Sequence, residues 1–127
     1  MQSAAKATIL CIDDEPASMD LRRRVLEQEG YRVVVTANPQ EGMRLFKEEA
    51  FDLVVLDYWM AKLNGLLVAK ELKQMKPKVP IVMLSGYSPL LDEYIGRVDE
   101  WIVKGESDPA DLINTVRQLL KARHSHH

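Results

Sequence analysis

The sequence predicts an α/β protein built on a doubly wound, five-stranded parallel sheet. Short apolar runs rich in valine, leucine and isoleucine alternate along the chain with longer segments of helical periodicity. Most of these runs lack the polar alternation of a half-buried strand, which is typical of strands that are covered on both faces. Because right-handed crossovers join parallel strands, we expect helices on both faces of the sheet.

Five short segments have the composition of strands, and each is followed by a helical segment. The strands are expected at 8–12, 31–37, 51–57, 81–84 and 100–103. The segment 31–37 alternates and is rich in β-branched residues, so we expect it nearer an edge of the sheet. The helices are expected at 16–29, 39–49, 65–75, 88–98 and from 109 onward. Gly96 makes the segment 88–98 the weakest of them.

Local signals mark several of the helix ends. Pro16 suits a first helical turn, and Gly30 is a helix stop. Asn38 is predicted to cap the second helix, with Pro39 and Glu41 in its first turn. The helices at 65–75 and after 109 are amphipathic. Their expected inward residues are Val68, Ala69, Leu72 and Met75 in the first, and Leu112, Ile113, Val116, Leu119 and Leu120 in the second.

Length and charge limit the class of protein. The chain of 127 residues predicts a single domain, with a core at about 7–122 and a tail at 123–127. A net charge of −2 argues against nucleic-acid binding by bulk electrostatics. The basic cluster 22–24 has acids around it, and we interpret it as a solvated helix face. No apolar stretch approaches the ~20 residues of a membrane span, and residues 1–7 lack the apolar core expected of a signal peptide.

Cysteine and histidine usage excludes several kinds of site. Cys11 is the only cysteine, which favours a reducing, cytoplasmic setting and, inside an apolar run, predicts a buried thiol. The three histidines lie at 124, 126 and 127, where a disordered end or a remnant of cloning is favoured over a metal-binding tail. The rest of the chain therefore holds neither a Ser-His-Asp triad nor a phosphohistidine.

Functional side chains follow four of the five predicted strands. Asp13 and Asp14 come after the first, Asp57 ends the third, Ser85 follows the fourth and Lys104 follows the fifth. The carboxyl ends of parallel strands meet at one edge of a sheet, so we expect these side chains to converge. Three close carboxylates raise one another's pKa unless a cation intervenes. Oxygen ligands without His or Cys suit Mg²⁺, or Mn²⁺.

This arrangement predicts a phosphoryl acceptor. A divalent cation beside the acids would neutralise an incoming phosphoryl group, and the carboxylate of Asp57 could act as the nucleophile. Lys104 and Ser85 are suited to hold the other phosphoryl oxygens. Taken singly, each of these residues has a plain structural explanation, as a helix cap, a solvated charge or a turn residue. Their joint position at strand ends favours the functional interpretation.

The motifs closely resemble the receiver domain of two-component response regulators, over nearly the whole chain. They are Ile12-Asp13-Asp14-Glu15, Leu56-Asp57-Tyr58-Trp59-Met60 with Asn64-Gly65, Leu84-Ser85-Gly86, and Val103-Lys104. The resemblance implies a flavodoxin-like (βα)5 fold with strand order 2-1-3-4-5. It also implies a protein that assists its own phosphorylation and dephosphorylation without turning over a substrate.

The resemblance implies a role for each site residue. Asp57 would accept the phosphoryl group from a sensor histidine kinase or a phosphotransfer protein. The Mg²⁺ ligands would be Asp14 directly, Asp13 largely through water, Asp57, and the backbone carbonyl of Trp59. Ser85 would turn toward the phosphoryl group and Lys104 would pair with it.

The resemblance also implies a switch and an output surface. Trp101 stands at the position of the switch aromatic, which swings inward when the hydroxyl of Ser85 moves. A downstream protein, rather than nucleic acid or membrane, would bind the face formed by 88–98, 100–103 and the helix after 109. Tyr94 and Trp101 are the aromatic residues expected there.

The chain departs from the family pattern at several places. Ala61 and Gly105 replace prolines, so the first loop is less rigid and a cis peptide after Lys104 is not assured. Gly86 follows the hydroxyl residue where alanine is commoner, which loosens the backbone. Trp59 and Tyr87 are bulky side chains on the path of a hydrolytic water. We predict slow self-dephosphorylation, which Trp59→Asn would accelerate.

Two other functions remain open from the sequence. An aspartyl-nucleophile phosphohydrolase that depends on Mg²⁺ usually has a second acid two residues after the nucleophile, where this chain has Trp59. A receiver-fold interaction module that never carries phosphate would not need the intact acids and Lys104. The chain could also be a receiver from a longer regulator with an output domain.

Overall fold

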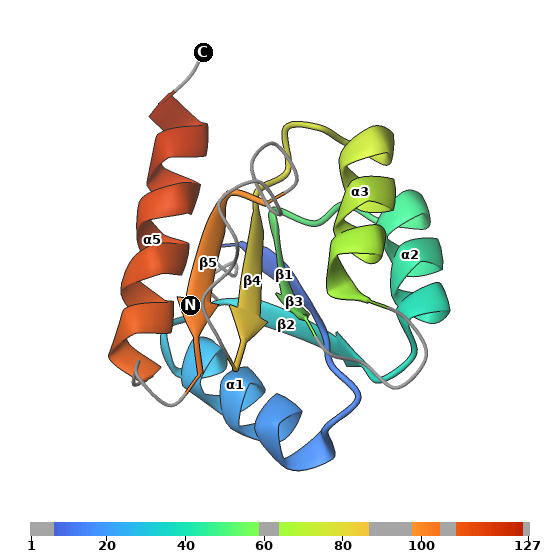
Figure 1. Cartoon of the computed structure of the whole chain (residues 1–127). Coiled ribbons are helices and arrows are strands. Elements are labelled where there is room, and N and C mark those ends of the chain that lie inside the picture. The colour runs from blue at the N-terminus through green and yellow to red at the C-terminus, as the bar shows by residue number, and fades with distance from the viewer. Residues whose placement is uncertain (1–6, 59–63, 87–97, 105–108, 126–127) are drawn as a thin grey trace.

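A computed structural model describes residues 7–58, 64–86, 98–104 and 109–125 of the chain. Within these ranges strands and helices alternate (Figure 1). The strands are β1 (Thr8–Ile12), β2 (Arg32–Thr36), β3 (Leu53–Asp57), β4 (Ile81–Ser85) and β5 (Glu100–Val103). The helices are α1 (Pro16–Gln28), α2 (Pro39–Glu48), α3 (Gly65–Met75) and α5 (Pro109–Ser125). The helix expected at 88–98 lies outside the described residues, apart from its last position.

The five strands form one parallel sheet in the order β2-β1-β3-β4-β5. The predicted fold class and strand order are confirmed, and β2 lies at an edge as its composition indicated. Figure 1 shows α1 and α5 on one face of the sheet and α2 and α3 on the other. No helix in the described ranges is long and apolar enough to cross a membrane.

Each face of the sheet has its own core, because side chains alternate along a strand. Leu10 and Ile12 of β1 pack toward α2 and α3, whereas Ile9 and Cys11 pack toward α1 and α5. Full burial of one such aliphatic side chain contributes about 1.5–3 kcal/mol. Both faces of β1, β3 and β4 are covered by these cores. The packing therefore fixes the positions of the residues at the carboxyl ends of these strands.

Most of the predicted helix ends agree with the structure. Asn38 caps α2 by accepting hydrogen bonds from the backbone N–H groups of Gln40 (2.9 Å) and Glu41 (3.2 Å). After α1 the chain turns at Gly30, whose φ of 96° is a conformation that residues with a Cβ avoid. The cap of α1 is Glu15, which accepts from Ser18 N–H at 3.1 Å.

Two predictions about inward faces need correction. Met75, expected inward on α3, is 38% exposed, because it lies in the last turn just before the chain leaves the helix. On α5, Leu112, Val116 and Leu120 are buried, but Ile113 is only half-buried. The helix continues to Ser125, and Arg123 donates to the Asp52 carbonyl at 2.7 Å, where we expected the tail to begin.

Candidate functional site

The sheet brings three acids together at its carboxyl edge. Asp57 is the last residue of β3, and Asp13 directly follows the neighbouring strand β1. A carboxylate oxygen from each of Asp13, Asp14 and Asp57 lies within 4.8 Å of the others. Asp13 and Asp57 are almost fully buried, at 1% and 4% exposure. The convergence expected from the sequence is therefore present in the structure.

Both oxygens of the Asp13 carboxylate are engaged by the protein. Oδ1 accepts a hydrogen bond of 2.9 Å from the N–H of Glu15. Oδ2 forms a salt bridge with the guanidinium of Arg22, from α1, whose side chain is only 12% exposed. The backbone N–H of Asp13 donates to the Thr36 carbonyl at 3.2 Å. These contacts fix the position of the Asp13 carboxylate within the cluster.

Lys104 reaches the site from the end of β5. Its backbone N–H donates to the Ser85 carbonyl at 2.6 Å, which aligns the ends of β4 and β5. Its ammonium forms an ion pair with Oδ1 of Asp57. Apart from this ion pair, Oδ1 is buried and accepts no hydrogen bond of good geometry within the described residues. Ser85 is 1% exposed at the end of β4.

Burial governs the ionisation of Asp57. Desolvation raises the pKa of its carboxyl, because the charged form loses water that the protein replaces only in part. The negative charge of Asp13 raises it further. The cations Lys104 and Arg22 oppose both effects, yet the net direction is upward. A further positive charge beside these acids would therefore be stabilising.

The donor set fits a hard divalent cation. Three carboxylates, without nitrogen or sulfur ligands among the described residues, are the kind of ligand that Mg²⁺ and Mn²⁺ take. Trp59, whose backbone carbonyl the sequence predicted as a further ligand, lies outside the described residues.

Comparison with known proteins decides the family. The model of the response regulator receiver domain matches residues 9–117. This chain is a response regulator receiver domain. A probable transcriptional regulator ycf27 of Porphyridium aerugineum is 41% identical over 123 residues, which cover 91% of this chain and 49% of that protein. The chain spans about half the length of the curated relatives it matches.

Solved receivers superpose on nearly the whole chain. The receiver domain protein (CheY-like) from Methanospirillum hungatei JF-1 has a TM-score of 0.88 and 26% identity, covering 95% of this chain and 98% of that one. The response regulator TrrA from Thermotoga maritima, in complex with Mg(2+)-BeF, has a TM-score of 0.82 and 32% identity. The aligned region covers 89% of this chain and 98% of the TrrA chain. The resemblance read from the motifs is thus confirmed.

The start of α3 packs against the end of β3 beside Asp57. Asn64 caps α3 by accepting from Leu66 N–H at 2.7 Å, and its amide donates to the Tyr58 hydroxyl at 3.3 Å. The N–H of Gly65 donates to the Tyr58 carbonyl at 2.7 Å. A Cβ on Gly65 would lie only 2.5 Å from the Asp57 carbonyl oxygen. Glycine therefore allows the helix to begin directly beside Asp57.

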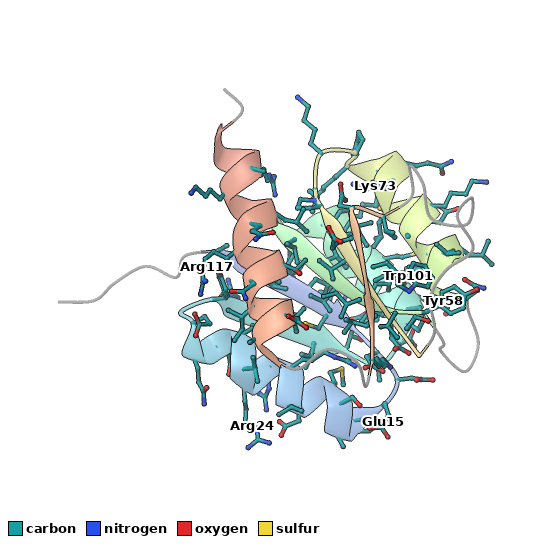
Figure 2. All side chains as sticks on the ribbon, turned by 60° about the vertical axis from the view of Figure 1, so that its left-hand side comes forward. Glu15, Arg24, Tyr58, Lys73, Trp101 and Arg117 are labelled. Carbon is teal, nitrogen blue, oxygen red and sulfur yellow. The ribbon has the colours of Figure 1, made fainter. Side chains whose placement is uncertain are left out.

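The predicted switch aromatic, Trp101, lies beside the residue that follows β3. Trp101 of β5 is half-buried, and its ring lies 5.3 Å from that of Tyr58 at an interplanar angle of 50°. Figure 2 shows the two labelled rings as neighbours. Tyr58 directly follows Asp57, so one ring contact joins the end of β3 to β5. Tyr87, Tyr94 and the peptide between Lys104 and Gly105 fall outside the described residues, and the expectations about them stay predictions.

Arg22 is the site residue that sequence analysis missed. The cluster 22–24 was interpreted as a solvated face, and this is wrong for Arg22, which turns inward to Asp13. Arg23 and Arg24 do fit the prediction, with side chains 43% and 65% exposed. A signal was available: Arg22 lies one helical turn before Leu26, the fully buried residue of α1, and so shares its inward face.

Proposed function

We propose that this receiver is a phosphoacceptor that depends on a divalent cation, with Asp57 as the phosphorylated residue. The donor is a phosphohistidine of a sensor histidine kinase or a phosphotransfer protein. One observation carries the proposal: Asp13, Asp14 and Asp57 lie within 4.8 Å of one another, and the Lys104 ammonium pairs with Asp57. The TrrA relative, solved in complex with Mg(2+)-BeF, supports a divalent cation at such a site.

The transfer uses the carboxylate of Asp57 as nucleophile. One of its oxygens forms the new bond to phosphorus while the bond from phosphorus to the donor nitrogen breaks, and the electron pair stays on that nitrogen. Mg²⁺, or Mn²⁺, supplies neutralisation of the phosphoryl charge when bound. Asp13, Asp14 and Asp57 would hold the cation, with the backbone carbonyl of Trp59 as the further ligand that the family resemblance implies.

Two further side chains orient the phosphoryl group. Lys104, already paired with Asp57, exchanges the carboxylate for a phosphoryl oxygen that carries more charge. Ser85 lies on the neighbouring strand β4 and donates its hydroxyl to another oxygen. The backbone hydrogen bond from Lys104 N–H to the Ser85 carbonyl keeps the ammonium of Lys104 and the hydroxyl of Ser85 on adjacent strand ends.

Phosphorylation by a small donor tests the proposal. The protein is incubated with acetyl phosphate and MgCl₂, and its intact mass is measured. We expect wild type to gain one phosphoryl group and Asp57→Asn to gain none. Asp20→Asn is the matched control, because Asp20 is an exposed acid on α1 outside the cluster, and it should behave as wild type.

Three results would contradict the proposal. They are phosphate on Asp57→Asn, no phosphate on wild type, or equal labelling in excess EDTA. Continuous release of phosphate from p-nitrophenyl phosphate, lost in Asp57→Asn, would instead indicate a phosphohydrolase. A discrete acyl phosphate that forms once per chain supports the receiver function.

We also propose that a protein partner recognises the phosphorylated state at the surface of β5 and α5. The path from Asp57 to this surface is the contact between Tyr58 and Trp101. In Trp59→Phe, only Trp101 remains as a tryptophan, so its fluorescence should change on addition of acetyl phosphate with Mg²⁺. An unchanged spectrum, at full phosphorylation by mass, would contradict a switch at Trp101.

A further inference from the structure

Arg22 places a second fixed cation in the acid cluster. Its guanidinium pairs with Oδ2 of Asp13, and its side chain is 12% exposed. The two arginines that follow behave differently. Arg23 and Arg24 both pair with Asp20 on the same helix, at 2.7 Å and 3.3 Å. Arg24 is exposed and Arg23 is half-buried. Figure 2 shows Arg24 pointing away from the sheet.

The charge balance of the site follows from these contacts. Three carboxylates, those of Asp13, Asp14 and Asp57, face two cations, Arg22 and Lys104, within the described part of the chain. One net negative charge is left to attract a divalent cation. With Lys104 alone, two would be left.

Asp13 has little freedom to serve a metal ion. Oδ1 accepts from the Glu15 N–H and Oδ2 is held by Arg22. A bound cation must share Asp13 with a guanidinium that cannot lose its proton. Burial keeps water from screening the repulsion between the two positive groups.

We infer that Arg22 is a positioning residue that holds Asp13 and sets the divalent-cation affinity of the acid cluster at a low value. The inference rests on the proposed function, because it concerns the same cation. Removing the charge of Arg22 should lower the Kd for Mg²⁺ about tenfold. This is the order of magnitude expected when the repulsion between one unit charge and a divalent ion, in partly screened surroundings, is removed. Arg22 thereby makes phosphorylation depend on the Mg²⁺ concentration.

Titration calorimetry with MgCl₂ on the full chain tests this inference, with Mn²⁺ followed by electron paramagnetic resonance as a second probe. Arg22→Gln removes the charge and keeps a polar side chain. Arg24→Gln removes the same charge from the same helix outside the cluster. Arg22→Lys keeps the charge. We expect the Kd to fall about tenfold in Arg22→Gln only, with the other two variants within about twofold of wild type.

Equal or weaker Mg²⁺ binding by Arg22→Gln would overturn the inference, and so would a similar gain in Arg24→Gln. If Arg22→Gln does not fold, as judged by circular dichroism, Arg22→Met replaces it with the same expectation. Failure of the proposed function would give a different result: wild type would carry no phosphate on Asp57 even at saturating Mg²⁺. Tighter cation binding by Arg22→Gln would support the inference even then.

Discussion

Replacing Gly65 by alanine should displace the backbone at the end of β3, beside Asp57. The added Cβ would lie 2.5 Å from the carbonyl oxygen of Asp57 and 2.8 Å from the Cα of Tyr58. Both are backbone atoms in a buried strand end, so no side chain can turn away to make room. Ordinary contact needs about 3.5 Å, and the start of α3 or the end of β3 must move by on the order of 1 Å.

The magnitude follows from two opposing effects. Overpacking of this kind costs about 1–3 kcal/mol, and alanine returns at most about 1 kcal/mol through its better helix propensity. We expect a net loss of about 2 kcal/mol in the free energy of unfolding. For 127 residues, this corresponds to a fall in Tm of about 7 °C.

Gly86→Ala is the matched control. A Cβ at Gly86 meets no atom within 4 Å, and this residue also lies at a strand end on the same edge of the sheet. Urea denaturation followed by circular dichroism should move the midpoint of Gly65→Ala down by about 1 M and leave that of Gly86→Ala nearly unchanged. Phosphorylation by acetyl phosphate should also slow in Gly65→Ala, because the backbone of Asp57 is displaced.

Equal midpoints for Gly65→Ala and wild type would refute the reasoning. That result would mean that the close approach of α3 to the acceptor strand can relax without cost. A large loss in Gly86→Ala would refute it equally, because the control site has room for the methyl group.

Three further predictions concern ionisation, capping and the thiol. Because burial raises the pKa of Asp57, the folded protein binds its proton more tightly than the unfolded chain; ionisation therefore costs stability as pH rises through that pKa. In EDTA at pH 7, Asp57→Asn should raise the free energy of unfolding by about 1–2 kcal/mol. This gain should vanish as the pH falls toward 3.8, the ordinary pKa of an aspartate, because Asp57 is then protonated in the folded protein. An equal gain at every pH would contradict the prediction. Asn64→Ala removes the cap of α3 and should lower the free energy of unfolding by about 1 kcal/mol in a thermal melt. Asn114→Ala, at an exposed position inside α5, should cost little. Burial raises the pKa of the Cys11 thiol to about 12, so at pH 8 a disulfide reagent should label it only as fast as the protein unfolds.

The sequence alone determined the fold class and the strand ends at which the acids stand. Both depend on local patterns: the apolar runs, the caps such as Asn38, and a carboxylate at the last residue of β3. In a parallel sheet these patterns suffice, because the topology brings all carboxyl ends to one edge. The proximity of Asp13, Asp14 and Asp57 could therefore be predicted before any coordinates.

Only the tertiary structure decided which charges lie inside the cluster. Helical spacing places Arg22, and not Arg23 or Arg24, on the face of α1 that carries Leu26. That its guanidinium reaches Asp13 depends on how α1 packs against the sheet. The approach of Gly65 to the Asp57 carbonyl and the ring contact of Trp101 with Tyr58 likewise depend on distances between separate elements. Such distances result from the packing of whole elements, and neither residue type nor periodicity specifies them.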